Sequence, residues 1–134
     1  MIYFGILLAG FLSFMLGALW YTALFGKAWK KATGFDDPEK LQEMEKNSNI
    51  PLTMGTTLVV EIIVAAIIAY TIFYFNITEW SQILLLGAIL GVFAVTANIK
   101  NYLYENKSMA LFFISEGYKF TVTILMVVIL KFFI

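Results

Sequence analysis

The run from Ile2 to Phe25 constrains the fold more than any other feature, because it contains no charged side chain. At about 1.5 Å of rise per residue, a helix of this length can cross the roughly 30 Å hydrocarbon core of a bilayer. Further apolar runs follow at about 53–75, 83–97 and 109–131, of which 83–97 is the shortest. The sequence therefore predicts an all-α polytopic membrane protein, a four-transmembrane-helix bundle that forms a single domain over residues 1–134.

Composition agrees with a membrane protein and excludes several classes of site. Hydrophobic residues make up 61% of the chain, against roughly 45–50% in globular proteins. The sequence has no Cys and no His, which removes thiolate and imidazole as nucleophiles, general bases and metal or haem ligands. It also has no Arg for bidentate recognition of phosphate. We therefore expect no enzyme, no catalytic residues, no metal, no cofactor and no nucleic-acid partner, with membrane lipid as the surrounding partner.

One hydrophilic segment, residues 26–50, separates the first two spans and must lie in water. Asp37 followed by Pro38 has the pattern of a helix cap and first turn. Leu41 and Met44 then give one apolar edge, so the segment predicts a short cytoplasmic helix from Pro38 to about Lys46.

The lysines of the connecting segments indicate how the chain is oriented. The loops after the first and third spans carry seven lysines, whereas the opposite side carries only Lys131; the seven are Lys27, Lys30, Lys31, Lys40, Lys46, Lys100 and Lys107. Because cytoplasmic loops are enriched in Lys and Arg, both termini are predicted to be non-cytoplasmic. This bias argues against antiparallel dimers of dual-topology chains, so we expect a homo-oligomer whose subunits are parallel.

Small residues recur along one face of two spans, and aromatic residues end the first. Ridges of this kind let another helix approach closely, and one could serve an interface between subunits. The first ridge consists of Gly5, Ala9, Ser13 and Gly17; the second begins with Gly87 and Gly91 and continues to Ala94 and Asn98. Trp20, Tyr21 and Trp29 lie where aromatic belts meet the membrane surface, which favours interfacial anchoring.

Three charged residues interrupt the apolar spans and form the candidate site. Glu61, Glu116 and Lys119 all lie about 10–15 Å from the cytoplasmic ends of their spans by helical rise. A charged side chain without a partner inside the membrane costs about 2.5–3.5 kcal/mol on insertion scales. Two interpretations remain open: a proton or ion site, or a structural ion pair that fixes helix register. One lysine neutralises only one carboxylate, so we expect Lys119 to pair with Glu61 while Glu116 shares that ammonium or carries a proton.

Two short motifs resemble signatures of a known family. Gly17-Ala18-Leu19-Trp20-Tyr21-Thr22, followed by Phe25-Gly26-Lys27 and Trp29, is similar to an opening signature, and Leu111-Phe112-Phe113-Ile114 with Gly117-Tyr118 to a closing one. The family comprises small bacterial four-helix integral membrane proteins of unknown function. The resemblance implies four spans and the bacterial inner membrane, but no catalytic or ligand residues. The buried charges favour an ion- or proton-coupled transporter or channel for a small solute; the alternative is a structural or accessory protein that binds lipid or another membrane protein.

Overall fold

The computed structural model describes residues 1–134, and every regular element in it is a helix. The elements are α1 (Ile2–Leu19), the π-helical turn η1 (Trp20–Leu24), α2 (Gly26–Thr33), α3 (Pro38–Asn47), α4 (Ile50–Tyr74), α5 (Trp80–Tyr104) and α6 (Met109–Lys131). Four helices are long and apolar enough to cross a membrane: α1 with η1, α4, α5 and α6. The prediction of an all-α protein with four apolar spanning helices is therefore confirmed.

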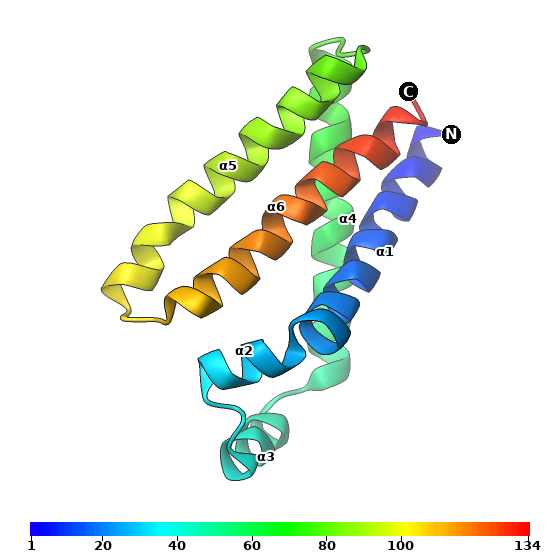
Figure 1. Cartoon of the computed structure of the whole chain (residues 1–134). Helices are drawn as coiled ribbons and strands as arrows, with labels where there is room; N and C mark the ends of the chain where they lie inside the picture. Colours follow the sequence, from blue (N-terminus) through cyan, green and yellow to red (C-terminus); the bar gives the residue numbers. More distant parts are fainter.

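Helix α6 is the central element of the bundle. It packs against α1, α4 and α5, whereas α5 packs mainly on α6. Figure 1 shows α6 between α5 and α1, with α4 behind it and with α2 and α3 at the end opposite the two termini. The termini lie together, because the rings of Phe4 and Phe133 are 5.6 Å apart. The best-buried core joins α4 to α6 through apolar residues that include Ala65, Ile72, Met126 and Leu130.

Local sequence signals account for where the shorter helices begin and end. The Asp37 side chain accepts a hydrogen bond from the Glu39 amide and caps α3, with Pro38 in the first turn. Helix α2 ends at Gly34, whose φ of 84° is a left-handed conformation that glycine adopts without strain. The predicted surface helix is thus present and ends one residue later than expected, and α2 precedes it as an additional short helix.

Helix α5 differs from the prediction, which placed its end near Ala97 and made it the shortest span. It runs for 25 residues, as long as α4. The helix continues because its polar residues are accommodated: Asn101 donates a hydrogen bond to Asn98 within the helix, and Lys100 is exposed near its end. The connection between the third and fourth spans, expected over about 98–108, is therefore shorter, and α5 and α6 are joined only by residues 105–108.

Both small-residue ridges are used inside the chain. A Cβ atom added at Gly5 would lie 2.8 Å from the Phe133 ring, and one added at Gly17 would lie 2.7 Å from the Tyr118 hydroxyl. Ala9 and Ser13, between them, are fully buried. On α5, Gly87 and Gly91 receive side chains of α6 in the same way. These two ridges thus bring α1 and α5 close to α6, and neither is left free for a second subunit.

Candidate functional site

The three predicted charged residues occupy two sites on different faces of α6, not one cluster. Lys119 contacts Glu116, with 3.1 Å between Nζ and Oε1, whereas Glu61 contacts Tyr118. The predicted pair of Lys119 with Glu61 is not formed. Glu116 and Tyr118 are two positions apart, so their side chains leave α6 about 200° apart around the helix axis. Helical rise predicted that Glu61 lies level with Glu116 and Lys119, and its contact with Tyr118 agrees with this, but rise did not determine which neighbour each residue faces.

The first site centres on Glu116, between α5 and α6. Its side chain is 1% exposed. Oε1 accepts two hydrogen bonds, one from Asn98 Nδ2 at 2.8 Å and one from Lys119 Nζ at 3.1 Å. The other oxygen, Oε2, is buried and has no hydrogen-bond partner in the protein. Asn101 donates to Asn98 Oδ1 at 2.9 Å, so a polar track leads from the exposed end of α5 to the buried carboxylate.

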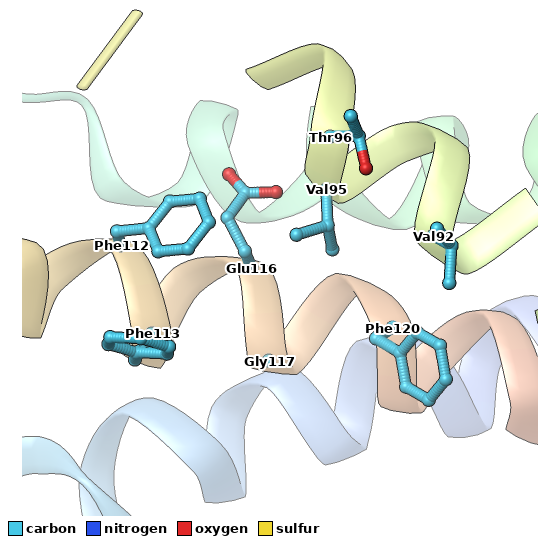
Figure 2. Close-up of a pocket in the computed structure, with 8 residues that line it drawn as sticks. All are labelled: Val92, Val95, Thr96, Phe112, Phe113, Glu116, Gly117 and Phe120. Carbon is cyan, nitrogen blue, oxygen red and sulfur yellow. The ribbon is translucent and has the colours of Figure 1, made fainter. Parts of the chain in front are cut away.

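A pocket of about 290 Å³ lies beside this carboxylate. Figure 2 shows Glu116 extending from α6 into the space between Phe112 and Val95. The walls are mostly apolar and come from α5 and α6: Val92, Val95, Thr96, Phe112, Phe113, Glu116, Gly117 and Phe120. Gly117 contributes no side chain, and the Phe120 ring lies over Gly91 of α5, so small residues on both helices shape the space.

Lys119 is the movable partner of the Glu116 site. Its side chain is 45% exposed, in contrast to the buried carboxylate that it contacts. A lysine side chain is a flexible stem with a compact charge, so it can turn away from Glu116 without any movement of the helix. The site therefore combines a fixed acceptor with a donor that can leave.

The second site centres on the Tyr118 hydroxyl, where α1, α4 and α6 meet. Its oxygen lies 3.0 Å from the Ser13 carbonyl oxygen of α1 and 3.3 Å from Oε1 of Glu61 of α4. Glu61 is partly buried and has no cationic partner. The Ser13 hydroxyl is buried and makes no hydrogen bond. This side of α6 thus holds an acid with only a phenol beside it.

The aromatic residues that end the first span pack against the second site. The Trp20 indole donates to the carbonyl of Ile114 at 2.9 Å, which ties η1 to α6. The Tyr21 ring lies 5.5 Å from that of Tyr118 and 6.2 Å from that of Trp29. In addition to the interfacial role predicted for them, these residues therefore position α6.

The family model described as "Protein of unknown function (DUF1761)" matches residues 4–131. The chain belongs to this family. No curated protein and no solved structure matches it. The DUF1761 match supports the resemblance to a family of unknown function.

Sequence reasoning missed three polar residues that complete these sites: Asn98, Asn101 and Tyr118. A signal existed for Asn98, which continues the small-residue ridge of Gly87 and Gly91 and therefore faces the same neighbouring helix. Tyr118 was noted only within a motif, because a tyrosine in an apolar run is ordinarily a packing residue. Its hydroxyl gains hydrogen-bond partners only because α1 and α4 both pack against this part of α6.

Proposed function

We propose that this DUF1761 protein is a proton-coupled carrier of a small solute in the membrane, with Glu61 as the carboxyl group that exchanges the proton. One observation carries the proposal. The single hydroxyl of Tyr118 faces two acceptors, the Ser13 carbonyl oxygen and Glu61, and no cation contacts Glu61.

The hydrogen count at Tyr118 supports a proton on Glu61. A phenol has one hydrogen to donate, so it cannot satisfy a carboxylate and a carbonyl oxygen together. When Glu61 is protonated, its own O–H can donate to the Tyr118 oxygen while Tyr118 donates to Ser13. Without a cationic partner, a carboxyl group in an apolar setting is favoured in its neutral form. Because Glu61 is only partly buried, it can exchange its proton when α6 moves relative to the α1–α4 pair.

Helix α6 provides a physical link between proton and solute. Tyr118 on one face contacts Glu61, and Glu116 on another face lies beside the pocket. A change in the position of α6 therefore alters both sites, which is the requirement for coupling two binding events through one element. The alternative, a structural or accessory protein, loses the support of two free packing ridges, since both are covered within the chain.

Proton exchange can be tested directly. In liposomes that contain a pH-sensitive dye, the wild-type protein should relax an imposed pH gradient, and Glu61→Gln should abolish this activity. Glu105→Gln, which removes an acid in the exposed turn after α5, is the matched control and should behave as wild type. Infrared difference spectra should show a protonated-carboxyl band that disappears as the pH rises and is absent from Glu61→Gln. If wild-type and Glu61→Gln liposomes relax equally and no band titrates, the structural alternative replaces the carrier.

We also propose that the protein lies in the bacterial inner membrane with both termini outside the cytoplasm. The lysine bias supports this orientation, and the termini lie together opposite α2 and α3 (Figure 1). A phosphatase that is active only outside the cytoplasm should be active when fused after Ile134 and inactive when inserted after Asn106. Activity at both positions would indicate dual topology, and it would contradict the proposal that any homo-oligomer is parallel.

A further inference from the structure

We propose that the pocket beside Glu116 binds a small, uncharged, mostly apolar molecule that carries a hydrogen-bond donor. This assignment names the class of solute and rests on the proposed carrier function. The proposal rests on Glu116, which lines the pocket and whose second oxygen, Oε2, is buried and has no hydrogen-bond partner in the protein.

The two oxygens of Glu116 have unequal surroundings. Oε1 is shared by Asn98 and Lys119, whereas Oε2 receives no donor. Leaving a buried carboxylate oxygen without a donor is costly, because it has lost its hydration and gained nothing in return. No side chain of the protein donates to this oxygen, so a ligand with an N–H or O–H group would complete the site.

Charge indicates that the ligand is neutral. Lys119 already balances the charge of Glu116. A cationic ligand would place a second positive charge on one carboxylate or would have to displace the ammonium of Lys119. An anion would face the free oxygen of Glu116, and like charges in an apolar site repel strongly. A neutral donor satisfies Oε2 and leaves the ion pair undisturbed.

The volume and lining of the pocket indicate the size and the apolar character of the ligand. Its volume of about 290 Å³ lies at the lower end of the range of roughly 300–1,000 Å³ for ligand pockets, so the ligand is small. Three phenylalanine rings line it, namely Phe112, Phe113 and Phe120. Phe113 is 69% exposed, which places the mouth of the pocket at the outer surface of the bundle. A flat apolar ring with one donor group therefore fits the walls, and it can enter from the membrane.

Indole is a suitable probe, because it has an aromatic body, one N–H donor and no strong acceptor. 1-Methylindole is its matched analogue without the donor, and tryptamine adds a positive charge. The chain has no Cys, so the substitution Thr96→Cys places a single thiol in the pocket wall. The rate at which N-ethylmaleimide labels this thiol then reports occupancy of the pocket. Ile67→Cys, on the exposed surface of α4, gives the control thiol that indole should not protect.

The expected result is that indole protects the thiol at position 96 at a membrane concentration about tenfold or more below that of 1-methylindole, the effect of one hydrogen bond to a charged group. Glu116→Gln should reduce this preference severalfold, because its amide offers a weaker, uncharged acceptor. Val92→Phe, which enlarges a side chain of the pocket wall and leaves Glu116 unchanged, should remove protection by both compounds. Since Val92 is exposed on α5, this variant keeps the test valid if Glu116→Gln fails to fold.

Three outcomes would overturn the assignment. Equal protection by indole and 1-methylindole would show partition into an apolar space without the predicted hydrogen bond. Protection by tryptamine at lower concentration than indole would show a site for cations. Equal protection of the thiols at positions 96 and 67 would show a general effect of the compounds on the membrane. If any of these occurs while the Glu61 carboxyl band still titrates, only the solute class is wrong and the carrier function stands.

Discussion

The two acids Glu61 and Glu116 lie on opposite sides of α6, in different surroundings. On the side of α5, Glu116 has a cation, an amide and a pocket beside it. On the side of α1 and α4, Glu61 has only the Tyr118 hydroxyl, in a region where helices approach closely. The first setting balances a carboxylate and leaves space for a ligand, whereas the second suits a carboxyl group that keeps its proton.

The two sides of α6 differ in helix packing as well as in charge. Between α1 and α4, a Cβ atom added at Gly10 would lie 2.8 Å from the Cα atom of Ile62, so backbone meets backbone. Between α5 and α6, a Cβ added at Gly91 would meet the Phe120 ring, a side chain that also lines the pocket. The first contact is rigid and the second can adjust. We therefore expect motions of the bundle to involve α5 more than the α1–α4 pair.

The largest expected effect comes from the glycine in the rigid contact. Gly10→Leu should destabilise the protein by about 3 kcal/mol or more, because overpacking here must separate two helix backbones. Gly91→Ala should cost about 1–2 kcal/mol, since the Phe120 ring can rotate. Thermal unfolding in detergent measures both.

Gly55 provides the control for this pair, because a Cβ atom added there meets nothing within 4 Å. Gly55→Ala should be neutral or stabilise by up to about 1 kcal/mol through its higher helix propensity. If Gly91→Ala proves as damaging as Gly10→Leu, the distinction between a rigid and an adjustable side of α6 is wrong.

The sequence predicted the spanning helices well, because long apolar runs leave few alternatives in a membrane. It also placed Glu61 level with the stretch of α6 that holds Glu116 and Lys119, because position along a helix follows from helical rise alone. The partner of each acid was not predictable, because it depends on how helices are arranged around α6. If the small-residue ridge of α5 is known to face α6, the contact of Asn98 with Glu116 becomes predictable. The pocket, however, depends on the rotamers of phenylalanine side chains that no spacing rule fixes.

A smaller effect should follow from breaking the Glu116 network. Asn98→Leu should lower stability by about 1.5–3 kcal/mol, because a hydrogen bond to a buried charged group is lost. The double variant Asn98→Leu with Glu116→Leu should be less damaging than the sum of the single variants. Each single variant leaves one member of the hydrogen-bonded pair without its partner, whereas the double variant removes both members. A double-mutant cycle measured by unfolding gives this coupling. Additive effects would indicate that Asn98 and Glu116 do not interact.

Tyr118→Phe should have a still smaller effect on stability, of about 1 kcal/mol. The hydroxyl it removes contacts Ser13 and Glu61, but the ring that packs against Tyr21 remains. The variant should therefore fold like wild type in detergent while the protonated-carboxyl band of Glu61 shifts in frequency. An unchanged band would mean that Tyr118 and Glu61 are not hydrogen-bonded in the membrane.

The smallest effect is expected at the ion pair outside the membrane, which makes it the natural contrast to Lys119 and Glu116. Lys107 Nζ lies 2.7 Å from Oε2 of Glu105, and the hydrogen bond and charge of Glu105 raise the pKa of Lys107. A raised folded-state pKa stabilises the protein below the ordinary lysine value of about 10.4, and the contribution is lost as pH rises above it. Because both side chains are exposed, water and salt screen the pair.

Lys107→Met should therefore leave the unfolding temperature at neutral pH unchanged within error, whereas Lys119→Met should lower it measurably. Equal losses from the two variants would mean that the buried setting of Glu116 adds nothing to its ion pair.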